Sequence, residues 1–329
     1  MRIALVQSKD SLPSIFSPKA LELLGNMGEL VYNDGAGDPE QVKKTVKGAD
    51  IAITSWGNGL FTEDILDVAP DLKLIAHAAG TVKVIVTDAV WERGIRVTGS
   101  PKAIAEGVGE TALGLTITAS RNFYKASEVM HAGGWNDGVA AGIKDLYNVV
   151  IGVVGAGWAG KHYIKLLKSF DVDVILYDPF VDEKKAEELG VKKVGFETLL
   201  KESDIVSLHA PSIPETRHML NADTLALMKK DAVLINTARG SLIDENALAE
   251  HMKAGNLKYA CLDVYDPEPP AKDSPLRGIP NIILTPHIAG VSTNGRRKIG
   301  MHVVSELELF LAGKTMECEV TRDMLATMA

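Results

Sequence analysis

Short runs of consecutive aliphatic residues recur along the whole chain and alternate with amphipathic stretches of helix length. In the first third of the chain these runs occupy residues 3–6, 30–32, 51–54, 72–76 and 95–98. They are apolar at consecutive positions rather than at every second one, which is typical of strands buried on both faces of a parallel sheet. The first third of the chain is therefore predicted to form an α/β layer structure.

The pattern changes after Pro101, because residues 101–131 show an approximate helical period and no strand pattern. A single long helix is predicted there. An amphipathic helix is predicted over 299–311. Between these helices the aliphatic runs resume, at 149–154, 172–177, 205–208, 233–236, 259–262 and 282–285. This order predicts two doubly wound parallel-sheet units joined by the long helix.

Composition narrows the class of protein. The chain has 329 residues, 46% of them hydrophobic and 24% charged, which fits a globular protein of about two domains. Its net charge of −8 disfavours nucleic acid and anionic lipid as partners. No apolar run approaches the roughly 18 residues of a membrane span, and the first six residues predict a strand rather than a signal peptide. Cys261 and Cys318 are too few for a disulfide framework and lack metal-ligand spacing, so a cytoplasmic protein without a metal site is expected.

A glycine-rich turn follows the predicted strand at 149–154 and precedes a helical stretch. Its sequence is Gly155-Ala156-Gly157-Trp158-Ala159-Gly160. The first glycine permits a tight turn, the second lets a pyrophosphate approach the backbone, and the third lets helix and strand pack closely. The N–H groups at the start of the helix would hold the anion. A purely structural turn is the alternative for this motif alone.

Asp178 stands at the end of the next predicted strand and strengthens the dinucleotide interpretation. A carboxylate at this spacing can accept hydrogen bonds from both hydroxyls of an adenosine ribose and would repel a 2′-phosphate. No arginine adjoins it to receive such a phosphate. The sequence therefore predicts NAD rather than NADP as cofactor.

Polar clusters follow four later strands, where ligands of open α/β sheets bind. They are His209-Ala210-Pro211, Thr237-Ala238-Arg239, Asp263 with Glu268, and the run from His287 to Gly290. Hydride transfer to a ketone needs a proton donor and a cation near the oxygen. Arg239, Glu268 and His287 supply a cation, a carboxylate and an acid/base. Taken singly, each residue is more typical of a structural role, and only their joint placement at strand ends after the glycine-rich turn favours catalysis.

With these motifs the chain resembles the D-isomer-specific 2-hydroxyacid dehydrogenase family, over nearly its whole length. The matching runs lie at 153–160, 208–216, 236–244, 262–270 and 284–290. The resemblance implies a Rossmann NAD-binding domain (102–286) inserted into a discontinuous flavodoxin-like substrate domain (1–101 and 287–329). It also implies a substrate in the cleft between the domains and a homodimer formed through the helix near 105–123.

The resemblance assigns roles to individual residues. Arg239 would bind the substrate carboxylate and oxo group, His287 would be the acid/base, and Glu268 its partner. The substrate set comprises Ala79, Gly80, Thr81, Arg239 and His287. The cofactor set comprises Gly155, Gly157, Trp158, Ala159, Gly160, Asp178, His209, Ala210, Pro211, Thr237, Ala238, Arg239, Asp263, His287 and Gly290, with Asp263 on the nicotinamide side.

Together these features predict an NAD-dependent oxidoreductase that interconverts a D-2-hydroxy acid and a 2-oxo acid. Two alternatives remain open: an NAD(H)-sensing corepressor-like binding protein, and a phosphite-type dehydrogenase of the same superfamily. Formate is disfavoured, because formate dehydrogenases of this superfamily carry glutamine where Glu268 stands. The loop after Thr81 departs from the family pattern and leaves the 2-oxo acid unidentified. His77 and Trp135 are interpreted either as pocket residues or as buried packing residues.

Overall fold

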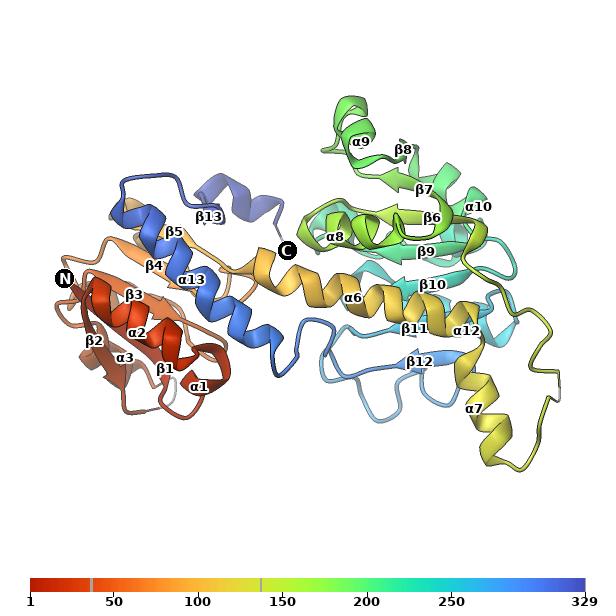
Figure 1. Ribbon diagram of the computed structural model, residues 1–329, viewed down its shortest axis with the longest axis horizontal. Coiled ribbons are helices and arrows are strands. Elements are labelled where there is room, and N and C mark those ends of the chain that lie inside the picture. The colour runs from red at the N-terminus through yellow and green to blue at the C-terminus, as the bar shows by residue number, and fades with distance from the viewer. Residues whose placement is uncertain (36–37, 137, 329) are drawn as a thin grey trace. The chain divides into compact units, whose positions relative to one another are not determined.

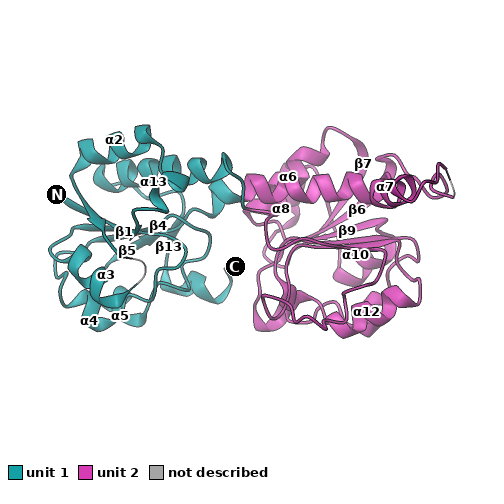
Figure 2. Ribbon diagram, turned by 90° about the horizontal axis from the view of Figure 1, so that it is seen from below, with its two compact units in different colours: residues 1–104, 291–329 teal, residues 105–290 magenta. Residues whose placement is uncertain are grey.

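The computed structural model describes residues 1–35, 38–136 and 138–328. The chain forms two compact units, one of residues 1–104 and 291–329 and the other of residues 105–290, as Figure 2 shows by colour. We call them unit 1 and unit 2. Each contains one sheet with helices on both faces, which confirms the predicted fold class of two doubly wound α/β domains.

Unit 1 is built on a six-stranded sheet with the order β13-β5-β4-β3-β1-β2 (Figure 1). The strands are β1 (Arg2–Ser8), β2 (Glu29–Asn33), β3 (Ile51–Thr54), β4 (Leu74–His77), β5 (Arg96–Thr98) and β13 (Glu319–Val320). The pairs are parallel except the one between β13 and β5. Successive side chains of β1 point to opposite faces, so Ile3 and Leu5 enter one core cluster and Ala4 and Val6 the other.

The helices of unit 1 divide between these two clusters. Residues of α1 (Leu12–Ile15), α2 (Pro18–Met27) and α13 (Gly295–Leu311) pack with Ile3 and Leu5. Residues of α3 (Pro39–Val46), α4 (Glu63–Leu66) and α5 (Asp88–Glu92) pack with Ala4 and Val6. The C-terminal helix thus returns to the first sheet, and a 3-10 segment, η3 (Arg322–Ala326), follows β13.

Unit 2 is built on a seven-stranded parallel sheet with the order β12-β11-β10-β9-β6-β7-β8. The strands are β6 (Tyr147–Val154), β7 (Asp171–Tyr177), β8 (Lys192–Lys193), β9 (Ile205–Leu208), β10 (Val233–Asn236), β11 (Tyr259–Leu262) and β12 (Ile282–Leu284). One face packs on α6 (Pro101–Ser120), α8 (Trp158–Leu167) and α9 (Glu183–Leu189). The other packs on α10 (Phe196–Glu202), α11 (Ala222–Leu225) and α12 (Glu245–Lys253). Two 3-10 segments are η1 (Pro214–Thr216) and η2 (Gly240–Leu242).

The long helix predicted over 101–131 is wrong in one respect, because it is two helices. α6 ends at Ser120 and α7 (Phe123–His131) begins after Asn122, whose φ of 59° lies in the left-handed region. Asparagine tolerates this region better than most residues. Here its amide donates to Val139 O at 3.0 Å and accepts from the Tyr259 hydroxyl at 2.6 Å, which fixes the break.

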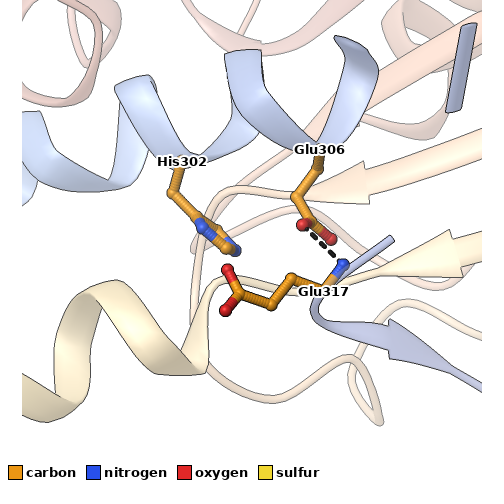
Figure 3. A group of neighbouring side chains, drawn as sticks. All are labelled: His302, Glu306 and Glu317. Carbon is orange, nitrogen blue, oxygen red and sulfur yellow. Dashed lines mark hydrogen bonds between the residues drawn. The ribbon is translucent and has the colours of Figure 1, made fainter. Parts of the chain in front are cut away.

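A buried carboxylate of α13, Glu306, binds the backbone just before β13 in unit 1, and Figure 3 shows its bond with the Glu317 N–H. Glu306 is 1% exposed and accepts hydrogen bonds from the backbone N–H of Glu317 at 2.9 Å, from that of Cys318 at 3.0 Å, and from the Thr98 hydroxyl. The ligand atoms of His302, Glu306 and Glu317 lie within 4.8 Å of one another. The Glu306 carboxylate is already held by these protein donors, so the cluster serves as a structural tie.

Candidate active site

Each glycine of the 155–160 turn has its own structural reason. Gly155 has a φ of +94°, and a Cβ there would lie 2.8 Å from Ala210 N. A Cβ on Gly160 would lie 2.1 Å from Gly155 O, so helix and strand could not pack as closely. Around a Cβ on Gly157, in contrast, there is no atom within 4 Å among the described residues. Gly157 therefore keeps open the space in front of the first turn of α8, where a pyrophosphate fits.

Asp178 follows β7 and is tied to this turn. Its Oδ2 accepts the Ala156 N–H at 2.8 Å and its Oδ1 accepts the Phe180 N–H at 2.8 Å. The carboxylate is thereby held beside the glycine turn, where a ribose attached to a bound pyrophosphate would lie. Phe180, two residues after Asp178, is 72% exposed, and Trp158 within the glycine turn is 42% exposed.

His209 follows β9 and lies against the glycine turn. Its Nε2 lies 2.9 Å from the Ser207 hydroxyl, and its ring centroid lies 5.2 Å from that of Tyr163 on α8. Desolvation lowers the pKa of His209 to about 4, so the ring is neutral at neutral pH. Its backbone is close enough to Gly155 that a Cβ on this glycine would lie 2.9 Å from His209 O. His209 and Ala210 thus border the glycine turn, and Pro211 follows them in the chain.

The acid/base pair predicted from sequence is brought together by the structure. His287 Nδ1 lies 2.7 Å from Glu268 Oε2, and the other oxygen of Glu268 accepts the Tyr265 N–H at 3.0 Å. The side chains of His287 and Glu268 are 49% and 36% exposed. With Nδ1 engaged by the carboxylate, Nε2 is the ring nitrogen left for proton transfer to a ligand.

Arg239 follows β10 and is the cation of the predicted catalytic group, which also contains Glu268 and His287. Burial lowers the pKa of Arg239, and the opposing influence is the negative charge of Glu268. Its Nη1 donates to Ala238 O at 2.6 Å. The loop is shaped by Asn236, whose side chain accepts from the Ala238 N–H at 3.0 Å and donates to Arg239 O at 2.8 Å. Thr237, next to it, has a buried hydroxyl without a hydrogen-bond partner among the described residues.

The loops after β10 and β11 approach closely at Gly240. A Cβ there would lie 2.0 Å from the carbonyl carbon of Tyr265. The Tyr265 hydroxyl donates to Thr285 O at 2.8 Å and to Leu262 O at 3.1 Å. Gly240 and Tyr265 thus connect the loops that carry Arg239, Glu268 and His287. Sequence reasoning did not single out Tyr265, although its position between Asp263 and Glu268 within a matching run was a signal.

Asp263 follows β11, and its side chain contacts the loop that carries His287. It is fully buried, and its carboxylate accepts hydrogen bonds from Thr285, Ile288 and Ala289. Gly290, at the end of this segment, is the last residue of unit 2. Asn236 and Thr285 also lacked a sequence prediction, because their importance comes from hydrogen bonds that a motif does not show.

The predicted substrate loop lies in unit 1, after β4. Ala79 is buried and its carbonyl accepts the Ser100 N–H at 2.8 Å, while Gly80 and Thr81 are partly exposed. His77, just before them, is 1% exposed, and its Nδ1 lies 2.8 Å from the Thr54 hydroxyl. Burial lowers the pKa of His77 to about 4. Its burial fits a packing role, whereas Trp135 is 79% exposed and is no buried packing residue.

Comparison with known proteins places these features in context. Residues 113–289 match the family model described as D-isomer specific 2-hydroxyacid dehydrogenase, NAD binding domain. The chain is 36% identical over 299 residues to a D-3-phosphoglycerate dehydrogenase of Methanocaldococcus jannaschii, a match that covers 91% of the chain and 56% of that relative. The chain thus spans little more than half the length of this relative.

Two further matches extend over almost the whole of both proteins. The chain is 33% identical over 291 residues to a hydroxypyruvate reductase of Thermotoga maritima, covering 88% of the chain and 94% of that protein. The solved structure of a D-2-hydroxyisocaproate dehydrogenase is similar with a TM-score of 0.83 at 28% identity, covering 98% of this chain and 100% of that one.

Proposed function

Because the chain belongs to the D-isomer specific 2-hydroxyacid dehydrogenase family, we propose that it is an enzyme that interconverts a 2-oxo acid and a D-2-hydroxy acid with NAD(H). The observation that carries the proposal is the contact between His287 and Glu268 at 2.7 Å, in the same unit as Arg239 and the glycine turn. A cation, a carboxylate and an acid/base are the groups that reduction of a ketone requires.

The glycine turn and Asp178 fit NAD, because the turn leaves space for a pyrophosphate and the carboxylate suits an adenosine ribose without a 2′-phosphate. When bound, NADH supplies the hydride. Arg239 pairs with the substrate carboxylate through its planar guanidinium and stabilises negative charge on the oxo oxygen. His287 donates the proton to that oxygen from Nε2. Glu268 keeps the ring oriented through its contact with Nδ1.

We assign unit 2 as the NAD-binding domain and unit 1 as the substrate domain. Ala79, Gly80 and Thr81 in the loop after β4 would contact the substrate. The remaining cofactor residues of unit 2 would be Trp158, Ala159, His209, Ala210, Pro211, Thr237, Ala238, Asp263 and Gly290. Assays of purified protein with NADH and a panel of 2-oxo acids test the assignment, and no turnover with any of them, despite NADH binding, would overturn it.

A homodimer is part of the proposal. No residue of α7 is buried, and its apolar side chains Phe123, Tyr124 and Met130 are 52%, 42% and 51% exposed. Exposed apolar side chains gathered on one element are typical of an interaction surface. α7 directly follows α6, which includes most of the segment 105–123 expected to pair. Sedimentation of the wild type and of a Phe123→Glu/Met130→Glu variant tests this: the wild type should be dimeric and the variant monomeric.

We also propose a cytoplasmic location, supported by two free cysteines that are both buried. None of the helices in the described part of the chain is long and apolar enough to cross a membrane.

Two assays separate the rival functions. Phosphite-driven reduction of NAD would favour a phosphite dehydrogenase, and NADH-dependent capture of a protein partner with very slow turnover would favour a corepressor-like protein.

A further inference from the structure

The loop after Thr81, where the chain departs from the family pattern, turns into the core of unit 1. Val82, Ile85 and Val86 are buried in one core cluster, and Val82 O accepts the next two of their N–H groups at 3.0 and 3.1 Å. Lys83 stands within this turn and is half-buried, and its N–H donates to the Thr81 hydroxyl oxygen at 3.4 Å. The position of Thr81, a proposed substrate residue, is therefore connected to that of Lys83.

Lys83 reaches from this turn to a segment that follows β13. Its Nζ donates to Met328 O at 2.7 Å, across 245 positions of the sequence. The side chains of Leu325 and Met328 pack against the core cluster that contains Val82. We call residues 321–328 the support segment. A hydrogen bond from an ammonium group is stronger than one between neutral groups, so it holds the turn against the support segment.

The support segment has an attachment of its own to unit 1. Arg322 Nη2 lies 2.7 Å from Asp88 Oδ1 at the start of α5, and both side chains are exposed. An exposed ion pair contributes little to stability, so the apolar packing of Leu325 and Met328 is the main attachment. Because the segment is attached without Lys83, its bond to Lys83 restrains the turn.

We propose that Lys83 and the support segment are positioning elements for residues 79–81, the substrate loop, and hold it in the conformation that binds the 2-oxo acid. The inference rests on the proposed function, which takes this loop as a substrate contact. On its other side the loop is held at Ala79, whose carbonyl accepts the Ser100 N–H at 2.8 Å. If the restraint at Lys83 is lost, each binding event must order the loop again, which costs affinity. NADH, assigned to unit 2, should bind as before.

The first test compares two substitutions of Lys83. Lys83→Met removes the ammonium and keeps a stem of similar length, whereas Lys83→Arg keeps a charged donor. With a 2-oxo acid that the wild type reduces, we expect KM to rise about 10-fold in the methionine variant, with kcat within about 3-fold and the NADH dissociation constant within about 2-fold. KM of the arginine variant should stay within about 3-fold of the wild type. A KM unchanged in Lys83→Met, or raised equally in both variants, would overturn the proposal.

The second test loosens the support segment without altering Lys83. Leu325→Ala does this, and Val68→Ala is its matched control, because both side chains are partly buried against the same core cluster and both variants lose packing. We expect KM for the 2-oxo acid to rise about 5- to 10-fold in Leu325→Ala and to stay at the wild-type value in Val68→Ala. A KM raised in Lys83→Met but not in Leu325→Ala would show that Lys83 binds the acid directly, and would overturn the positioning role.

Amide hydrogen exchange gives a readout that needs no substrate. The N–H groups of residues 80–84 should exchange about 10-fold faster in Lys83→Met than in the wild type, while those of β1 exchange at the same rate in both. Unchanged exchange at residues 80–84 would overturn the positioning role. Failure of the wild type to reduce any 2-oxo acid would overturn the proposed function instead, so the two failures are distinguishable.

Discussion

Glu268 holds His287 and is itself held by the backbone: its Oε2 lies 2.7 Å from His287 Nδ1, while its Oε1 accepts the Tyr265 N–H at 3.0 Å. This arrangement fixes the tautomer of the neutral ring, because Nδ1–H must face the carboxylate and Nε2 must face away from it. The segment between Tyr265 and Glu268 is short, so the orientation of the ring depends on the loop after β11 as much as on His287 itself.

Glu268→Gln should lower kcat for 2-oxo acid reduction about 10- to 100-fold, because an amide can turn an NH2 donor toward His287 Nδ1 and then no longer holds the ring as the carboxylate does. The NADH dissociation constant should change less than about 3-fold. Steady-state kinetics and NADH titration of the wild type and the variant measure both quantities. A kcat within a few-fold of the wild type would contradict the role of Glu268 in orienting the ring.

The glycines at 157 and 160 offer a matched pair. Gly157→Ala should leave the free energy of unfolding within about 0.5 kcal/mol, since the described residues leave open space around the new Cβ, but should weaken NADH binding at least about 10-fold. Gly160→Ala places a Cβ 2.1 Å from Gly155 O and should destabilise the protein by about 1–3 kcal/mol. Urea unfolding and NADH titration separate the two effects. Equal destabilisation by both variants would contradict this account of the turn.

Asp178→Ala should weaken NADH binding about 10- to 100-fold, the effect of removing a charged hydrogen-bond acceptor. NADPH binding should change less or improve, because the repulsion of the 2′-phosphate disappears. Fluorescence titration with both cofactors measures the ratio of the two affinities. If that ratio is unchanged, Asp178 acts only through its bonds to Ala156 and Phe180.

His77 makes stability depend on acid pH. Its pKa is lowered from 6.5 to about 4 by burial, so the unfolded chain binds a proton between these values that the native protein does not. The contribution to stability is complete above pH 6.5 and is lost as the pH falls towards 4. At pH 4.5 the loss should be about 2–3 kcal/mol relative to pH 7. His77→Gln should show a correspondingly weaker pH dependence in urea unfolding, and an identical dependence would show that the ring is hydrated.

Much of the fold could be predicted because strands buried on both faces leave consecutive aliphatic runs, as in β3 and β10, where every residue is buried. The two-residue strand β13 is too short to leave such a run. The break at Asn122 could not be predicted either, because its left-handed backbone is held by Val139 and Tyr259, which are distant in sequence.

The candidate site, like the fold, has features that the sequence predicts and features that it does not. Glycine spacing and polar strand ends pointed to the turn and to Arg239, Glu268 and His287. The hydrogen bonds of Asp263 to the 285–289 loop, and of Tyr265 N to Glu268, depend on the register of β11 and β12 and on loop conformation. Motif spacing carries no information about these.

The most direct test of the central claim uses the His287→Gln variant and a 2-oxo acid that the wild type reduces. The kcat for reduction of this acid by NADH is measured, and the affinity for NADH is measured separately by titration. Proton donation by His287 predicts that kcat falls about 10²- to 10⁴-fold while the NADH dissociation constant changes less than about 3-fold. A variant that retains kcat within a few-fold of the wild type would contradict the account.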